Sequence, residues 1–187
     1  MKILLFPALG LSLVFPVLAA DPAASPSPAA REVKHQMMTG KDFQDADLGQ
    51  TNFMRVRLNK ADFSGTTLTL VTFRQSDLSG SNFTGANFGP ETKFIESTLN
   101  DAVLEGLDLK GADFSKVNLR GANLKKTSNW GDVSDCTFSD ANLCGADLSG
   151  AKGDMETVQW SGAIYDDATK FPAGVDPVKE GARKSAN

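Results

Sequence analysis

The chain has 187 residues, of which 41% are hydrophobic, and a formal net charge of −4 at pH 7. A charge this small for the size of the chain argues against a strongly electrostatic partner, whether nucleic acid or an anionic membrane. With one histidine and two cysteines, the sequence also gives little support to a transition-metal site.

Residues 1–20 are predicted to be a cleaved signal peptide. Lys2 precedes an apolar run over residues 3–18, and Ala19-Ala20 follow it. This arrangement is typical of a secretory signal with cleavage after Ala19 or after Ala20. The alternative is a membrane anchor, for which a run of sixteen residues with two prolines is short. We therefore expect an exported protein without stable membrane insertion, in the periplasm or the medium.

Two short segments are predicted between this signal and the rest of the chain. Residues 21–30 read DPAASPSPAA, a composition typical of a flexible, partly extended linker. Residues 31–40 are predicted to form an N-terminal cap, because Val33, Met37 and Met38 can cover the end of a core that begins just after them.

From about residue 41 to residue 160, an apolar residue returns at every fifth position, usually within the phrase Ala-Asp/Asn-Leu/Phe-Ser-Gly. We call each of these residues a centre. Gly153 is the one centre that is not apolar. The centres are Phe43, Leu48, Phe53, Leu58, Phe63, Leu68, Phe73, Leu78, Phe83, Phe88, Phe94, Leu99, Leu104, Leu109, Phe114, Leu119, Leu124, Val133, Phe138, Leu143, Leu148, Gly153 and Val158.

A period of five fits neither a helix nor a straight strand. On an α-helix, successive centres would lie about 140° apart and would not share a face. In a strand, an odd period would place them on opposite sides. All centres can point inward only if the chain turns a corner in every repeat, and a chain that turns regularly becomes a coil.

The identity of the centres predicts the number of sides of this coil. Phe and Leu alternate strictly from Phe43 to Phe83, and only an even number of sides keeps that alternation from layer to layer. Two sides would leave no interior for a phenylalanine ring. We therefore predict four sides and about twenty residues per turn, with layers about 4.8 Å apart.

The residues around each centre are consistent with this geometry. The residue two before the centre is usually small and should also point inward. The residue two after it is often glycine, which suits a corner that needs unusual backbone angles. The residue just before the centre is often Asp or Asn, whose short side chain can bond the neighbouring backbone at a bend.

The five-residue spacing resembles that of the pentapeptide-repeat family, as do the phrases Ala-Asp-Phe-Ser-Gly at 61–65 and Ala-Asn-Leu at 122–124 and 141–143. The resemblance implies an all-β fold, a right-handed quadrilateral β-helix with short capping segments. The handedness comes from the resemblance alone. Lumenal members of the family add the thylakoid lumen to the compartments that export allows.

The beat is interrupted twice. At Gly89-Pro90 one extra residue is expected to bulge at a corner. Over residues 125–132 we expect about four extra residues looped out, with Trp130 near the tip, although a one-residue deletion also fits the spacing. The looped-out interpretation places Phe138 in one ladder with Phe53, Phe73, Phe94 and Phe114.

Residues 161–187 are predicted to form a C-terminal cap and tail. Trp160, Ile164, Tyr165 and Phe171 lie where the repeats fade and are expected to plug the end of the core. Residues after Pro177 are expected to form a short helix or to fray.

One candidate interaction loop stands out, with Lys126, Asn129 and Trp130 exposed for recognition. The alternative is that Trp130 folds back to cover a groove. Cys136 should point inward and Cys144 outward, so we do not expect these two to bridge, although Cys144 could pair between chains. The single histidine, His35, is interpreted as structural.

No catalytic, cofactor-binding or metal-binding residues are predicted, because the aspartates lie on an open, solvated wall. The leading hypothesis is an exported, non-enzymatic scaffold for an unknown protein partner, either monomeric or dimeric through its ends or a face. One alternative is a DNA-mimicking topoisomerase-interacting protein, which export and the basic Arg55, Arg57, Lys60 and Arg74 oppose. The other alternative is an enzyme with a site at the Trp130 bulge.

Overall fold

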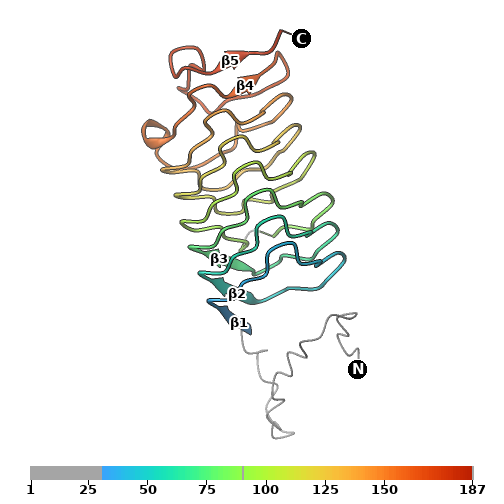
Figure 1. The fold of residues 1–187 in the computed structure, drawn as a ribbon. Coiled ribbons are helices and arrows are strands. Elements are labelled where there is room, and N and C mark those ends of the chain that lie inside the picture. The colour runs from blue at the N-terminus through green and yellow to red at the C-terminus, as the bar shows by residue number, and fades with distance from the viewer. Residues whose placement is uncertain (1–30, 90, 187) are drawn as a thin grey trace, which may run out of the picture.

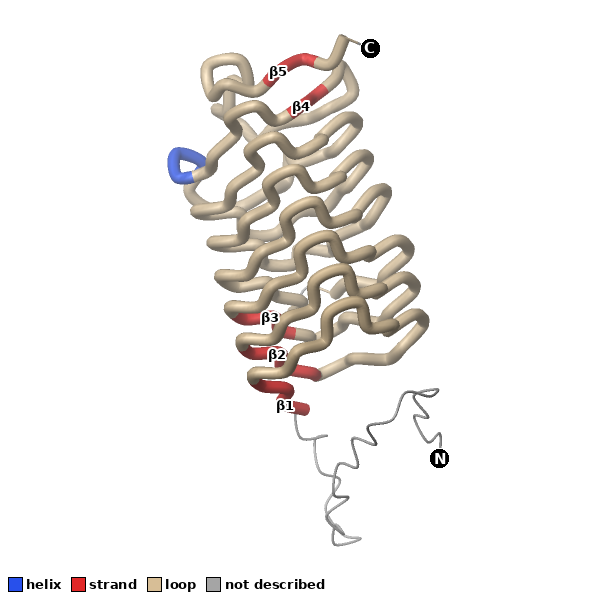
Figure 2. The backbone as a smooth tube through the Cα atoms, viewed as in Figure 1, coloured by secondary structure: helices blue, strands red, loops and turns tan. Residues whose placement is uncertain are grey.

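The computed structural model describes residues 31–89 and 91–186, which wind as a stack of turns (Figure 1). The predicted signal peptide and linker lie outside the described residues. Few positions are regular strand, and most of each turn is drawn as loop (Figure 2). No helix in the described part of the chain is both long and apolar enough to cross a membrane. The elements are β1 (Arg31–Lys34), β2 (Thr51–Met54), β3 (Thr72–Arg74), the 3-10 turn η1 (Met155–Thr157), β4 (Ile164–Tyr165) and β5 (Arg183–Lys184).

Every turn pairs in parallel with the next one. In the sheet β1-β2-β3, Val33 lies beside Phe53 and Phe53 beside Phe73. Isolated bridges repeat the same offset of one turn at the other sides, as between Met37 and Arg57. Since each turn of about twenty residues carries four such bridges, the coil has four walls.

We number the walls in chain order by their inward centres. Wall 1 begins at Val33, wall 2 at Met38, wall 3 at Phe43 and wall 4 at Leu48, and the bridges define the order along each wall. Wall 1 continues with Phe53, Phe73, Phe94, Phe114, Val133 and Gly153; wall 2 with Leu58, Leu78, Leu99, Leu119, Phe138 and Trp160; wall 3 with Phe63, Phe83, Leu104, Leu124, Leu143 and Tyr165; wall 4 with Leu68, Phe88, Leu109, Leu148 and Phe171.

Aromatic rings stack along these walls, as the spacing predicts for the first layers. On wall 1, the ring centroids of Phe53 and Phe73 are 4.9 Å apart, those of Phe73 and Phe94 5.1 Å, and those of Phe94 and Phe114 5.0 Å. Planes within 15° of parallel make each of these a stacked pair. All four side chains are at most 2% exposed, so burial and ring contact together stabilise the core.

The corners are made as the sequence predicts. The residue two after most centres has a left-handed backbone, as at Gly65 (φ 65°) and Gly80 (φ 66°) but also at Lys60 (φ 57°). Before the centre, Asp and Asn side chains accept the N–H of the residue two positions on. One such bond runs from the Gln44 N–H to Asp42, at 2.9 Å. Glycine therefore marks only some of the corners, and long polar side chains occupy the others.

The first interruption lengthens the turn by one residue. Bridged residues are 20 apart up to the Thr67–Asn87 pair and 21 apart from the Thr72–Lys93 pair onward. The additional residue therefore lies at the corner between Asn87 and Lys93. Pro90, within it, is outside the described residues.

The second interruption shortens the turn, and the looped-out segment expected over 125–132 is wrong. Asp108 still pairs with Ser128, 20 residues on, but Asn118 pairs with Thr137, only 19 residues on. One residue is missing at the corner before Gly131, which corresponds to the deletion alternative. Phe138 consequently follows Leu119 on wall 2 and does not join the phenylalanine ladder of wall 1.

The coil continues through both segments that the sequence assigns to caps. Residues 31–40 form the first layer: Val33 and Met38 point to the core, whereas Met37 points outward and is 72% exposed. At the other end, Trp160 stacks on Phe138 at 4.8 Å. Beyond residue 160 the chain makes another turn and closes it as β5 on β4. The segment after Pro177 is therefore neither helical nor frayed.

Replacing one inward ring should separate core from surface positions. Phe73→Ala should lower the free energy of unfolding by roughly 3–5 kcal/mol, because it removes a fully buried ring stacked on both sides. Thr72→Ala, at the neighbouring outward position, should change it by no more than about 0.5 kcal/mol. Thermal or denaturant unfolding of both variants measures the difference, and equal losses would contradict the inward assignment.

Candidate functional site

The candidate site is a groove of about 510 Å³ on the outer face of wall 3, near the C-terminal end. The parallel ladder that runs from Asn142 to Ile164 and on to Arg183 fixes its backbone. Outward side chains of consecutive turns therefore lie one above another. The lining residues, which we call the wall 3 groove, are Lys125, Lys126, Asn142, Cys144, Gly145, Ile164, Asp166, Ala168 and Ser185.

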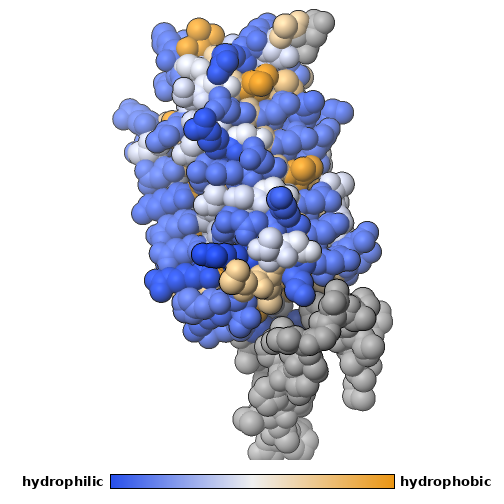
Figure 3. Space-filling view, in the orientation of Figure 1, coloured by the Kyte–Doolittle hydropathy of each residue, from blue (hydrophilic) through white to orange (hydrophobic). Residues whose placement is uncertain are grey.

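The groove combines an apolar floor with a cationic side. Ile164 is 39% exposed, and the free thiol of Cys144 is half-buried beside it in the groove lining. On the other side, neither Lys125 nor Lys126 takes part in an ion pair with a described residue. Elsewhere on the face seen in Figure 3 the surface is mainly hydrophilic, with apolar residues as isolated spots.

Gly145 keeps the groove open. Its φ of 68° lies in the left-handed region, and a Cβ at this position would lie 3.4 Å from Cγ of Lys126. A larger residue would therefore both strain the corner and push against the lysine stem.

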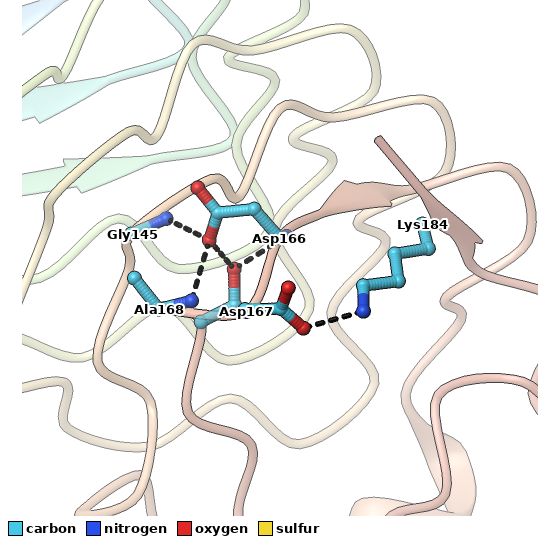
Figure 4. A network of polar contacts seen from close by, with 6 residues as sticks. Gly145, Asp166, Asp167, Ala168 and Lys184 are labelled. Carbon is cyan, nitrogen blue, oxygen red and sulfur yellow. Dashed lines mark hydrogen bonds and ion pairs between the residues drawn. The ribbon is translucent and has the colours of Figure 1, made fainter. Parts of the chain in front are cut away.

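Asp166 holds the lower edge of the groove in place (Figure 4). Its carboxylate accepts the N–H groups of Gly145 at 2.8 Å and Ala168 at 3.1 Å and the hydroxyl of Thr169 at 2.9 Å. The Gly145 N–H is the main reason that the pKa of Asp166 lies below its usual value. Asp166 thus joins two turns of the coil as a charged acceptor.

The next residue faces away from this network. Figure 4 shows Asp167 directed toward the ammonium of Lys184 on β5, with which it forms an ion pair. The hydrogen bond from Lys184 to Asp167 raises the pKa of the lysine. This exposed pair ties the last turn to the one below it and contributes little free energy by itself.

The arrangement favours binding over chemistry. The groove's one carboxylate is occupied by backbone bonds that keep it charged, which does not suit a general acid. Cys136 is fully buried, and burial raises the pKa of its thiol. Within residues 31–89 and 91–186, no group of three or more His, Cys, Asp and Glu side chains could hold a metal ion.

The predicted interaction loop does not exist as a loop. Trp130 is only 2% exposed, and its ring centroid lies 5.1 Å from that of Phe114 and 5.4 Å from that of Phe138. Asn129 is exposed but donates a hydrogen bond to Asp108 on wall 4, at 2.9 Å. The exposed Trp130 is therefore a wrong prediction, and Lys126 alone of the three predicted residues lines the groove. Trp130 turns inward because the shortened corner leaves space that an indole fills.

Sequence reasoning missed Ile164 and Asp166. Ile164 was assigned to the hydrophobic plug, yet it precedes Tyr165, which occupies the inward place on wall 3. Continuing the rule that residues beside a centre point outward would have placed Ile164 on the surface. The cysteines are placed as predicted: both are free, with Cys136 buried and Cys144 partly exposed.

Comparison with known families agrees with the coil. The family model for pentapeptide repeats matches eight copies, at residues 39–75, 69–88, 91–127 and 131–152, which together cover more than half of the chain. The chain belongs to the pentapeptide-repeat family. A search of curated proteins found no match.

Solved pentapeptide-repeat structures are similar only in outline. HetL of the cyanobacterium Nostoc is 18% identical, with 82% of this chain and 85% of that one covered and a TM-score of 0.33. QnrB1, a plasmid-mediated fluoroquinolone resistance protein, gives 14%, 84%, 91% and 0.39. A protein from the thylakoid lumen of Arabidopsis thaliana gives 28%, 65%, 70% and 0.34. With TM-scores this low, no property of these proteins is transferred to this one.

The Asp166 network should make stability depend on pH. A carboxyl with a lowered folded pKa stabilises the fold fully above its unfolded pKa, about 3.9, and this contribution is lost as pH falls through the folded pKa. Asp166→Asn should therefore melt earlier at pH 7 and lose less on acidification to pH 2 than the natural protein does. Thermal melts across this range test it. Asp167→Asn, which removes the same charge but no backbone bond, should keep the natural pH profile.

Proposed function

We propose that this pentapeptide-repeat protein is an exported, non-enzymatic scaffold that holds a protein partner in the wall 3 groove. The observation that supports it most is the groove itself, where Ile164, Cys144 and two unpaired lysines lie on a backbone fixed by inter-turn hydrogen bonds. A surface held this rigidly loses little conformational entropy when a partner binds, which favours recognition.

The partner's chemistry follows from the groove. Lys125 and Lys126 favour a carboxylate-bearing segment, and the partly exposed Ile164 favours an apolar side chain next to it. We therefore propose an extended acidic segment with an apolar anchor as the bound element. The right-handed sense of the coil is part of the proposal, because parallel strands joined by a crossover are nearly always right-handed. A crystal structure would test that sense directly.

Two earlier alternatives have less support. A DNA mimic needs a continuous acidic stripe, but on wall 1 the basic Arg55 and Arg74 replace acids in the N-terminal layers. An enzyme at the Trp130 bulge would need an open site there, and Trp130 is buried.

Export predicts a shortened mature chain. N-terminal sequencing of the protein accumulated by the producing cell should begin at Ala20 or Asp21, because residues 3–18 direct translocation. Leu13→Arg, which places a charge in that apolar run, should leave the full-length chain in the cytoplasm. A natural protein that keeps Met1 and stays in the cytoplasm would exclude export.

Partner binding should depend on Ile164. Affinity capture from the native compartment should retain a partner with the natural chain and lose it with Ile164→Glu, because the new carboxylate repels an acidic segment and removes the apolar contact. Lys110→Glu, an exposed change on wall 4, is the matched control and should retain the partner. If all three baits capture the same proteins, the groove is not the binding surface.

A further inference from the structure

The outer face of wall 1 carries opposite charge at its two ends. Counted by the wall 1 centres from Val33 to Gly153, it has seven layers, and each layer contributes outward residues to three parallel rows. The rows are Glu32, Asn52, Thr72, Lys93, Asp113, Asp132 and Lys152 before the centres; Lys34, Met54, Arg74, Ile95, Ser115, Ser134 and Asp154 after them; and His35, Arg55, Gln75, Glu96, Lys116, Asp135 and Met155 at the corner, with Glu156 next to the last.

The N-terminal layers are basic and the C-terminal layers acidic. In layers one to three, Lys34, Arg55 and Arg74 outnumber Glu32. In layers five to seven, five carboxylates stand against two lysines; the acids are Asp113, Asp132, Asp135, Asp154 and Glu156, and the lysines are Lys116 and Lys152.

Most of these charges have no partner within the chain. Among the described residues of this wall, the one ion pair joins Lys34 and Glu32. Arg55 and Glu96 are bridged by the amide of Gln75, through hydrogen bonds of 3.0 and 2.7 Å, so the corner row is ordered without being neutralised.

The relief of the wall is also opposite at its two ends. At the N-terminal end, a hollow of about 170 Å³ is lined by β1, β2 and β3, with Lys34, Met54 and Arg74 around it. At the C-terminal end, η1 projects from the side of the coil (Figure 2). Its backbone is held on this wall by the bond from the Asp154 N–H to the Ser134 hydroxyl, and Asp154 and Glu156 are exposed on it.

We propose that wall 1 binds a second copy of this chain, face to face and antiparallel, around a twofold axis between the fourth and fifth layers. A twofold axis makes each contact occur twice, since every residue meets in the partner the surface that its own counterpart meets. In this arrangement each row faces the same row of the other copy in reverse order. The projecting η1 of each copy then lies over the hollow of the other.

The charges match in this register. In the row before the centres, Lys93 faces the other copy's Asp113, and in the corner row Glu96 faces Lys116. Toward the ends, Arg55 faces Glu156, and Arg74 lies between Asp132 and Asp135. No position in any of the three rows meets a like charge.

Neighbouring registers do not match. With the axis at the fourth layer, Lys93 would face Lys93 and Glu96 would face Glu96 of the other copy. With the axis at the fifth layer, Asp113 and Lys116 would each meet themselves. Shifting the axis by one full layer toward the N-terminus sets Arg55 against Lys116, and the opposite shift sets Asp113 against Asp132. Since like charges across an interface are costly, one register is favoured.

The dimer should be weak and sensitive to salt. Six steps of about 4.8 Å and a strand width of about 13 Å give on the order of 400 Å² of wall per copy, which is at the low end for specific association. Its pairs are exposed, so salt should screen them. This inference does not rest on the wall 3 groove, which lies on the opposite side of the coil and would remain open.

Charge reversal at the corner row tests the register. Sedimentation velocity of the protein, purified as the producing cell accumulates it, should show reversible dimers at low salt that dissociate at high salt. Glu96→Lys or Lys116→Glu alone should weaken dimerisation roughly tenfold, because each places two like-charged pairs across the interface. The double variant restores opposite charges and should dimerise like the natural protein. Neither side chain carries a core or turn contact, and melting curves should confirm unchanged folding.

The controls separate this surface from others. Glu105→Lys and Lys110→Glu make the same charge changes on walls 3 and 4 and should leave the dimer intact. Small-angle scattering should show a pair no longer than about one coil. A protein that stays monomeric at low salt, single reversals without effect, a double variant that does not recover, or a pair twice the length of one coil would each overturn the proposal.

Discussion

The structure depends on the hydrogen bonds that join each turn to the next. The Phe53 wall, the corners and the outer rows all exist because backbone N–H groups find carbonyls one turn away, as from Phe63 to Asn82 at 2.7 Å and from Leu99 to Asn118 at 2.7 Å. These bonds need the chain to bend after every centre, and the left-handed residue at the corner provides the bend. Once the bend recurs, inward side chains stack and outward ones align without further instruction.

This explains why the sequence predicts the coil well and the Trp130 corner poorly. Five-residue spacing, the Phe–Leu alternation and the Asp or Asn before each centre are local patterns, and all agree on four sides. The nine residues from Leu124 to Val133 fit either two repeats less one residue or one repeat plus four. Spacing alone cannot choose between them. The choice depends on whether an indole fits inside, which is a property of the packed core around Phe114 and Phe138.

The two surface sites differ in how far the sequence could reveal them. The rows of wall 1 follow from the repeat once the number of sides is known, so the charges of Lys93, Glu96 and Lys116 could be placed in advance. The groove could not be, because Ile164 and Asp166 come after the last clear phrase. There, η1 and two longer turns break the spacing, with Thr137 and Gln159 paired 22 residues apart. Only the continued bridging to β5 shows that these residues share a wall with Cys144.

The fixed rise per turn makes the molecule a ruler. About six steps of roughly 4.8 Å separate the first layer from the groove level, so that distance is close to 29 Å and can change only in whole steps. Gain or loss of one complete turn between Phe53 and Phe114 would move the groove along the axis by one step while leaving its side chains and their neighbours as they are. Reach and binding chemistry are thus separable quantities in this chain, one set by counting turns and the other by the residues around Ile164.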